Sequence, residues 1–143
     1  MNPEPSLQVE CLVPGTAQGW LAVLSAPLSL WGGFDLESGK VSDVNHPQHG
    51  KLIAGRILVM PGGRGSSSSS SILLESARLG VHPKAIVITD RDPILVVGAL
   101  VAAELYGVSI PMVQADSCVL EALSAVQAAT LSAEPGRARI VPD

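Results

Sequence analysis

The chain is 143 residues long, which suits one domain that buries roughly 68 to 70% of the surface exposed by its unfolded chain. Hydrophobic residues make up 47% of it, charged residues 15% and aromatic residues 3%, so the core has to be aliphatic. Because the surface carries few charges, the composition slightly favours a protein whose surface is partly covered by another chain over a small apolar monomer. The formal net charge is −4 and the nine Lys and Arg residues are scattered, which argues against a nucleic-acid-binding protein.

The first residues of the sequence do not have the pattern of a signal peptide. In Met1 to Ser6, Pro3, Glu4 and Pro5 stand where a signal peptide has a basic and then an apolar run. No uninterrupted apolar window reaches the length of about 18 residues that a membrane span needs. We therefore expect a cytoplasmic protein without membrane association, folded as a single domain over residues 1–143 with a flexible leader at residues 1–6.

The N-terminal part is predicted to be rich in β-structure. Leu7 to Val13 alternate as a strand that Pro14-Gly15 ends, and Trp20 to Leu24 form a second short strand. The next segment, Ser25 to Gly50, has no sustained period. It is predicted to be a long ordered loop with at most one short strand, near Lys40 to Val44.

From Gly55 onward, the pattern predicts strands that alternate with helices. This alternation predicts an α/β domain with a mainly parallel sheet, flanked by helices and built with right-handed crossovers. The predicted elements are a strand at Arg56 to Met60, a helix through Ile72 to Leu79 stopped by Gly80, a strand at Ala85 to Thr89, a helix at Ile94 to Tyr106 stopped by Gly107, a strand at Ile110 to Val113, a helix at Cys118 to Leu131 capped by Asp116, and an edge strand at Arg139 to Val141.

Six consecutive serines, Ser66 to Ser71, follow a glycine-containing turn. Such a run can be a solvated linker, but this one is held between an apolar strand and an apolar helix. It is therefore predicted to be a strand-to-helix turn at the carboxyl end of a strand, where ligands bind in open α/β sheets. Gly62, Gly63 and Gly65 let the backbone approach a ligand, and the helix N-terminus favours an anion. We expect a carboxylate or phosphate site, without the lysine of a P-loop.

A serine in this loop could also take part in chemistry. As a nucleophile it would need a base, and the candidates are His46, His49 and His82, with no G-x-S-x-G elbow in the chain. This disfavours a serine hydrolase. As a general base on a carbon acid, the ionised serine would be stabilised by helix N–H groups and by Arg64. That reaction needs an electron sink, which this sequence lacks.

A series of motifs runs in order between about Cys11 and Val113. The motifs are Pro27-Leu28-Ser29-Leu30-Trp31-Gly32-Gly33-Phe34-Asp35, Asp43-Val44-Asn45-His46-Pro47, His49-Gly50, the segment Gly55 to Ser67, Asp92-Pro93, Gly98-Ala99 and Leu105-Tyr106-Gly107. Together they resemble the small subunit, or swivel domain, of the aconitase X family. The P-L-S-x-W-G-G and G-R-G-S-S elements are the specific ones.

The resemblance implies an aconitase-like swivelling β/β/α domain of an iron-dependent hydro-lyase. In that superfamily the large subunit supplies the cysteine ligands of an iron or iron–sulfur centre, and the swivel domain closes over it with a Gly-Ser-Ser loop. The first serine after the glycine removes the proton next to a carboxylate. This assigns the catalytic base to Ser66 and substrate contacts to Arg64, Gly65 and Ser67. The chain itself is expected to bind no metal and to act only with the large subunit, as a heterodimer or a dimer of heterodimers.

The resemblance leaves two substrates. The family dehydrates cis-3-hydroxy-L-proline in its bacterial type and mevalonate 5-phosphate in its archaeal type. Because the serine-rich loop is more similar to the bacterial type, we predict dehydration of cis-3-hydroxy-L-proline to a pyrroline-2-carboxylate, with the phosphomevalonate enzyme as the alternative. Aconitase has Arg-Glu after its two serines where this chain has Ser68 and Ser69, so no arginine contact is carried over. A non-catalytic module that captures a carboxylate or phosphate is the alternative from another class.

Several aromatic and histidine residues are interpreted as structural. Trp31 and Phe34 are expected in the core rather than at a substrate, because a flexible linker has no use for large apolar rings. His46 and His49 flank Pro47 in a loop and are expected to make structural hydrogen bonds rather than to support the site. His82 is likewise interpreted as structural.

The remaining polar candidates also have structural interpretations. Asp90, Arg91 and Asp92 follow a strand end at the same edge as the serine loop, and capping of the next helix is the favoured role of the aspartates. Cys11 and Cys118 lie far apart in sequence without a metal-binding pattern. They are expected to be buried reduced thiols rather than a disulfide.

Overall fold

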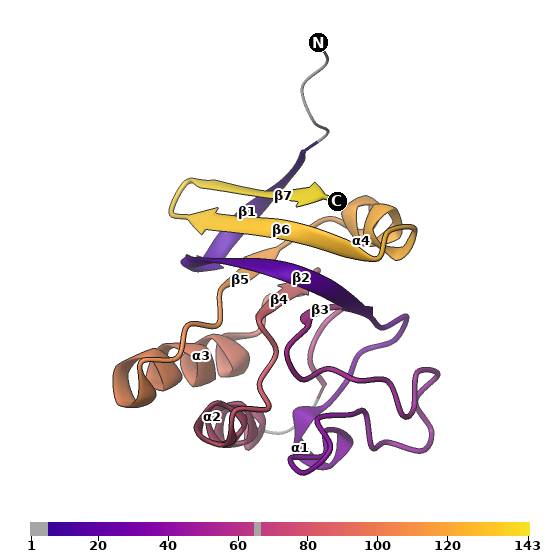
Figure 1. Ribbon diagram of the computed structural model, residues 1–143, viewed down its shortest axis with the longest axis vertical. Helices are drawn as coiled ribbons and strands as arrows, with labels where there is room; N and C mark the ends of the chain where they lie inside the picture. Colours follow the sequence, from indigo (N-terminus) through magenta and orange to yellow (C-terminus); the bar gives the residue numbers. More distant parts are fainter. Residues whose placement is uncertain (1–5, 65–66) are drawn as a thin grey trace.

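Within the described residues, 6–64 and 67–143, seven strands close into a barrel with helices packed around it (Figure 1). Helices α2 and α3 lie next to each other below the barrel in this view. The elements follow one another as β1 (Leu7–Val13), β2 (Gly15–Val23), α1 (Leu30–Gly33), β3 (Ile57–Met60), α2 (Ser69–Leu79), β4 (Ala85–Ile88), α3 (Pro93–Tyr106), β5 (Met112–Gln114), α4 (Ser117–Ser124), β6 (Ala128–Glu134) and β7 (Arg137–Pro142).

The barrel combines parallel and antiparallel pairing. Its strand order is β1-β5-β4-β3-β2-β6-β7, and β7 pairs with β1 to close the ring. Strands β2, β3, β4 and β5 are parallel neighbours, with Leu21 opposite Ile57 and Val59 opposite Val87. The other four pairs are antiparallel. The prediction of a mainly parallel sheet flanked by helices is therefore wrong. The parallel strands are present, but they form one part of a closed mixed barrel.

The error comes from the last third of the chain. The helix expected to reach Leu131 ends at Ser124, and β6 follows it. Along β6, the buried side chains of Ala129, Leu131 and Ala133 alternate with half-exposed ones, which is the pattern of a strand with one buried face. Alanine and leucine are also strong helix formers, so composition concealed the period of two.

The C-terminal hairpin closes the barrel. β6 and β7 are joined by Pro135-Gly136, where Gly136 takes a φ of +75° that suits glycine in a tight turn. β6 pairs with β2 on its other side, and β7 pairs with β1. The segment Arg139 to Val141 was expected to form an edge strand, but it is paired on both sides. Closure of the barrel removes the exposed edges that an open sheet would have.

The central strands are buried on both faces, which explains their continuous apolar sequences. On β3, Leu58 and Met60 belong to the hydrophobic cluster formed with α2 and α3. The alternate residues Ile57 and Val59 belong to a second cluster formed with β6, β7 and α4, which includes Leu131. The barrel strands thus separate two cores, and their rigid ends carry the loops described below.

The segment between β2 and β3 is a long ordered loop, as predicted. It contains the short turn α1 and isolated bridges, Phe34 with Val41 and Lys40 with Leu52, in place of the expected short strand. Phe34 is buried in the core, but Trp31 is 58% exposed, so the prediction of a core role is wrong for Trp31. The turn there is kinked by Gly32, whose φ is +81°. The strand predicted at Trp20 to Leu24 corresponds to the end of β2, which is longer and begins at Gly15.

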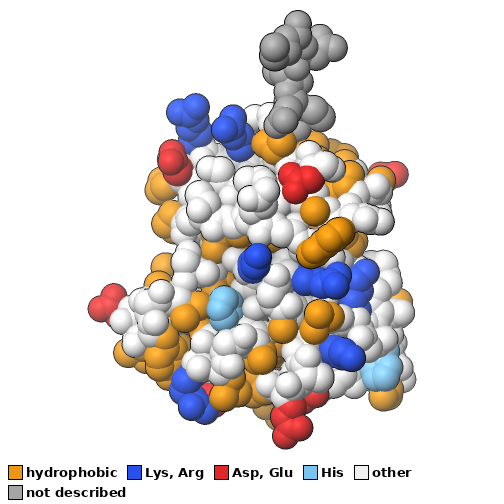
Figure 2. All heavy atoms as spheres, in the orientation of Figure 1, with side chains coloured by type: hydrophobic (Ala, Val, Ile, Leu, Met, Phe, Trp, Pro, Cys, Tyr) orange, Lys and Arg blue, Asp and Glu red, His pale blue; other side chains and the backbone are white. Residues whose placement is uncertain are grey.

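Hydrophobic side chains gather over the lower left of the face drawn in Figure 2, where α3 lies in Figure 1. None of the described helices is long and apolar enough to cross a membrane. α3 packs on the rest of the chain through its other face, where Leu95, Ala99 and Ala102 are buried.

Candidate active site

The serine loop leaves the carboxyl end of β3, between the segments that follow β2 and β4. Because these three strands are parallel neighbours, all three connections start at one edge of the barrel. The backbone N–H of Leu28 donates to the Gly62 carbonyl at 3.3 Å, and Leu28 forms a parallel bridge with Gly63. On the other side, the N–H groups of Thr89 and Asp90 both donate to the Pro61 carbonyl, at 3.1 and 3.0 Å. Both neighbours thus hold the start of the loop.

Packing leaves little space for a side chain at Gly62 and none at Gly63. A Cβ on Gly62 would lie 3.2 Å from the Cβ of Asp90, and a Cβ on Gly63 would overlap the Oδ2 of Asp92. Sequence reasoning assigned these glycines to the approach of a ligand and did not foresee the aspartates. The signal that could have found the contact is the Asp92-Pro93 pair at the end of the neighbouring strand, which places a carboxylate beside the glycine turn.

Asp92 caps α3, as predicted. Its Oδ1 accepts hydrogen bonds from the backbone N–H groups of Ile94 at 3.0 Å and Leu95 at 3.2 Å. These bonds satisfy donors that have no partner within the helix, and Pro93 fits the first helical position because it has no N–H to lose. Since the other carboxylate oxygen lies against Gly63, one side chain fixes both the start of α3 and the path of the serine loop.

Arg91 does not face the loop. Its guanidinium donates to the Gln114 side chain at 2.7 Å and forms an ion pair with Glu10 on β1. Gln114 in turn donates to the Thr89 carbonyl at 3.0 Å. The Thr89 hydroxyl oxygen is buried without a hydrogen-bond partner among the described residues. This network ties β4, β5 and β1 together at the edge where the loop begins.

The described serines belong to an ordered loop-to-helix junction. α2 begins at Ser69, which is buried, and the Ser70 hydroxyl donates to the Ser67 carbonyl at 3.0 Å. The alternative of a solvated linker is therefore wrong for Ser67 to Ser71. Of the predicted site residues, Arg64 and Ser67 are exposed at the two ends of the loop, whereas Gly65 and Ser66 lie outside the described residues.

Two of the three histidines are engaged in structural hydrogen bonds. His46 is buried; its Nδ1 accepts from the Gln48 N–H at 3.0 Å, so its Nε2 carries the hydrogen and donates to the Ala26 carbonyl at 3.0 Å. The Nδ1 of His82 lies 2.7 Å from the Pro83 carbonyl oxygen. The structural interpretation is thus confirmed for both. His49 is exposed, and its role remains a prediction.

The described residues do not form a metal site. They include no group of three or more His, Cys, Asp or Glu side chains arranged to hold a metal ion. Both cysteines are free, as predicted, but only Cys11 is partly buried, and Cys118 is exposed, which corrects the expectation of two buried thiols. Burial raises the pKa of the Cys11 thiol. The ligand set that an iron–sulfur cluster needs is therefore not provided by the described part of this chain.

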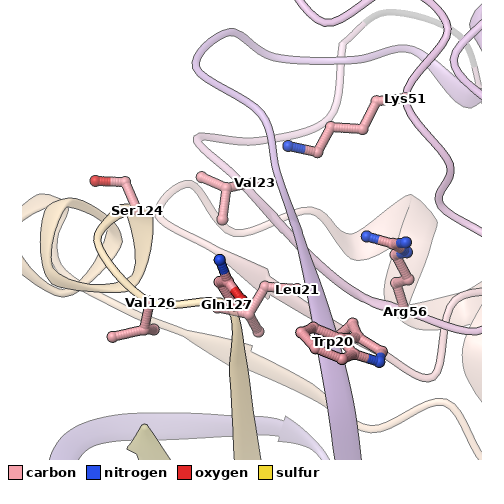
Figure 3. A pocket seen from close by; sticks show the side chains of 8 residues that line it. All are labelled: Trp20, Leu21, Val23, Lys51, Arg56, Ser124, Val126 and Gln127. Carbon is pink, nitrogen blue, oxygen red and sulfur yellow. The ribbon is translucent and has the colours of Figure 1, made fainter. Parts of the chain in front are cut away.

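A second hollow, of about 460 Å³, lies at the opposite end of β3, beside Trp20, Lys51 and Arg56 (Figure 3). Arg56 precedes β3, whereas the serine loop follows it. Val23, Ser124, Val126 and Gln127 line the other side of this hollow. None of the predicted site residues lines it, so the serine loop remains the candidate active site.

Comparison with known proteins agrees with the fold. The family model for the aconitase X swivel domain matches residues 6–140. The cis-3-hydroxy-L-proline dehydratase of Pseudomonas aeruginosa is 48% identical over 101 residues, which are 71% of this chain but 17% of that protein. The phosphomevalonate dehydratase small subunit of Methanothermobacter thermautotrophicus is 37% identical over 113 residues, 78% of this chain and 82% of the relative.

A solved structure matches nearly the whole chain. The crystal structure of Thermococcus kodakaraensis aconitase X in its holo-form superposes with a TM-score of 0.80 and 29% identity, covering 97% of this chain and 98% of that one. The family model, the relatives and this likeness agree with the motifs and with the barrel that carries them. The chain therefore belongs to the aconitase X family and has its swivel fold.

Proposed function

We propose that this chain is the small subunit of a two-chain hydro-lyase and that Ser66 is the general base of the dehydration. The observation that supports the proposal is the placement of the turn that leads into the serine run. Pro61, Gly62 and Gly63 follow the buried parallel strand β3, and the segments after β2 and β4 hold them on both sides. The curated relatives above are named as dehydratases, which supports the same reaction type.

The residues of the loop suit removal of a proton next to a carboxylate. The N-terminus of the eleven-residue helix α2 favours an anion, and Arg64 adds an exposed positive charge at the start of the loop. With the carboxylate held there, the ionised Ser66 hydroxyl takes the proton from the neighbouring carbon. The C–H electron pair forms a C=C bond as the C–O bond breaks, and the leaving hydroxide together with the proton taken up by Ser66 makes up the water that is released. Ser67 and the backbone of Gly65 are proposed as further substrate contacts.

We propose cis-3-hydroxy-L-proline as the substrate, giving a pyrroline-2-carboxylate. The support is the 48% identity to the Pseudomonas aeruginosa enzyme over the matched segment. Mevalonate 5-phosphate is the second candidate, because relatives of a length similar to this chain are named phosphomevalonate dehydratase small subunits. The matched segment is 17% of the first relative, so the whole enzyme needs a much larger protein part in addition to this chain. We propose that this part is the large subunit and that it holds the iron or iron–sulfur cluster.

The test is Ser66→Ala in the complex reconstituted with the large subunit. Loss of a general base should lower turnover by about 10² to 10⁴-fold, with the complex still formed. Ser71→Ala is the matched control, because it removes the same hydroxyl from an exposed position of the same serine run and should leave turnover unchanged. Assaying both substrates assigns the reaction. Near-normal turnover of Ser66→Ala would exclude Ser66 as the base, and binding of either acid without turnover by the wild-type complex would favour the non-catalytic module.

A further inference from the structure

We propose that the outer face of α3 is the surface on which the large subunit docks. We define this α3 face by Val97 and Leu100, together with the apolar groove at the start of the helix. The inference rests on the proposed function, because it names the contact surface of the two-chain enzyme. It adds a location on this chain that the similarity to other proteins does not give.

α3 has the composition of a helix that is covered on all sides. Among its 14 residues, Glu104 is the only charged one, and the apolar residues are not confined to one stripe. A helix that is hydrophobic all round is normally buried. Its inner side is indeed buried through Leu95, Gly98 and Ala99, and Gly98 allows α2 to approach closely, since a Cβ there would lie 3.0 Å from the Ser70 carbonyl oxygen.

None of the residues that the structure describes covers the outer side of α3. Val97 is 52% exposed and Leu100 is 50% exposed, and Leu105 and Tyr106 continue the exposed surface at the end of the helix. Half of the large exposed hydrophobic residues that the structure describes, four of eight, lie on this one helix. Figure 2 shows a hydrophobic area at its lower left, on the side where α3 lies in Figure 1. Exposed apolar patches of this kind mark interaction surfaces.

A groove of about 310 Å³ lies at the start of this face and includes Asp92, whose carboxylate lies against Gly63. Its charged members are already occupied: Arg91 is bound to Glu10 and Gln114, and Asp92 caps α3 and lies against Gly63. The groove therefore offers an apolar surface to a partner rather than a free charge. It is lined by Leu12, Arg91, Asp92, Pro93, Val96 and Val97.

The position of the groove favours the large subunit as the occupant. The protein that holds the substrate against the serine loop has to reach the same edge of the barrel. The α3 face begins at that edge, at Asp92. In the Pseudomonas aeruginosa relative, the matched segment is 17% of one polypeptide, so most of that enzyme is a body outside this domain. A second copy of this chain could cover α3 as well, but it would bring no further element to the loop.

The experiment measures binding of this chain to its large subunit, both purified, by calorimetry and by light scattering after size-exclusion chromatography. The variant Val97→Asp with Leu100→Asp places two carboxylates on half-exposed positions, where they stay solvated in the free chain. We expect its affinity to fall at least about 100-fold, because two central apolar contacts are lost. Trp20→Asp is the matched control: Trp20 is 59% exposed but lies beside the distant hollow of Figure 3. It should bind like the wild type, and thermal unfolding should show that both variants fold.

The outcomes separate this proposal from the proposed function. If the α3 variant is folded and binds the large subunit within threefold of the wild type, the docking surface lies elsewhere. The proposal would also be overturned if only Trp20→Asp lost binding to the large subunit. It would be overturned as well if this chain formed a self-dimer that the α3 variant disrupts while large-subunit binding stays unchanged. A wild-type complex in which Ser66→Ala remains fully active would refute the base assignment but leave the docking surface standing.

Discussion

Gly63 has no side chain, and the space a Cβ would fill is taken by the Asp92 carboxylate. We predict that Gly63→Ala destabilises the fold by about 2 kcal/mol, because Asp92 has to turn away and α3 loses its cap. The φ of Gly63 is not positive, so the alanine backbone itself is unstrained. Urea unfolding followed by circular dichroism measures the change in the free energy of unfolding.

The same residue pair supplies its own control. Asp92→Ala should cost about 1 kcal/mol through the lost cap. In that background, Gly63→Ala should add almost nothing, because the clashing carboxylate is gone, so the two changes are strongly coupled. Additive costs in the double variant would show that the glycine is required for a reason other than Asp92.

Some elements could be predicted from their own sequence, and others could not. β3, β4 and α3 are nearly as predicted, because continuous apolar runs, Asp92 and Gly107 mark them locally. β6 was not predicted, because its strand identity depends on pairing with β2 and β7, which are distant in sequence. For the site, the motifs located the serine loop, but the contact between Asp92 and Gly63 depends on two strands becoming neighbours. Local sequence does not encode that distance.

The strand assignment of β6 has a direct test. Leu131 is fully buried in the barrel core, and its neighbour Thr130 is half-exposed. We predict that Leu131→Ala lowers the free energy of unfolding by about 3 kcal/mol through the cavity it leaves. Thr130→Ala should change it by about 0.5 kcal/mol, as expected for a position outside the core. Chemical denaturation of both variants measures the difference, and similar costs at the two positions would argue against a period of two in this segment.

Barrel closure is a property of the whole molecule, and β1 reports on it. β1 pairs with β5 on one side and β7 on the other, so the ring cannot open at β1 without releasing one of these pairs. Cys11 lies on β1 opposite Val113 and packs against the barrel core. Burial there raises the pKa of its thiol, so less of the reactive thiolate is present at a given pH. Cys118 is exposed on α4.

We therefore predict two separate rates of alkylation by iodoacetamide at neutral pH. Cys118 should react quickly under native conditions. Cys11, which is partly buried, should react more slowly, at a rate that rises with sub-denaturing urea as the barrel opens at β1. Mass spectrometry of the peptides that contain each cysteine gives the two rates, and Cys118→Ser provides a chain in which Cys11 alone is followed. Equal rates at both cysteines in the native protein would mean that β1 is not held between β5 and β7 in solution, and that the barrel is open there.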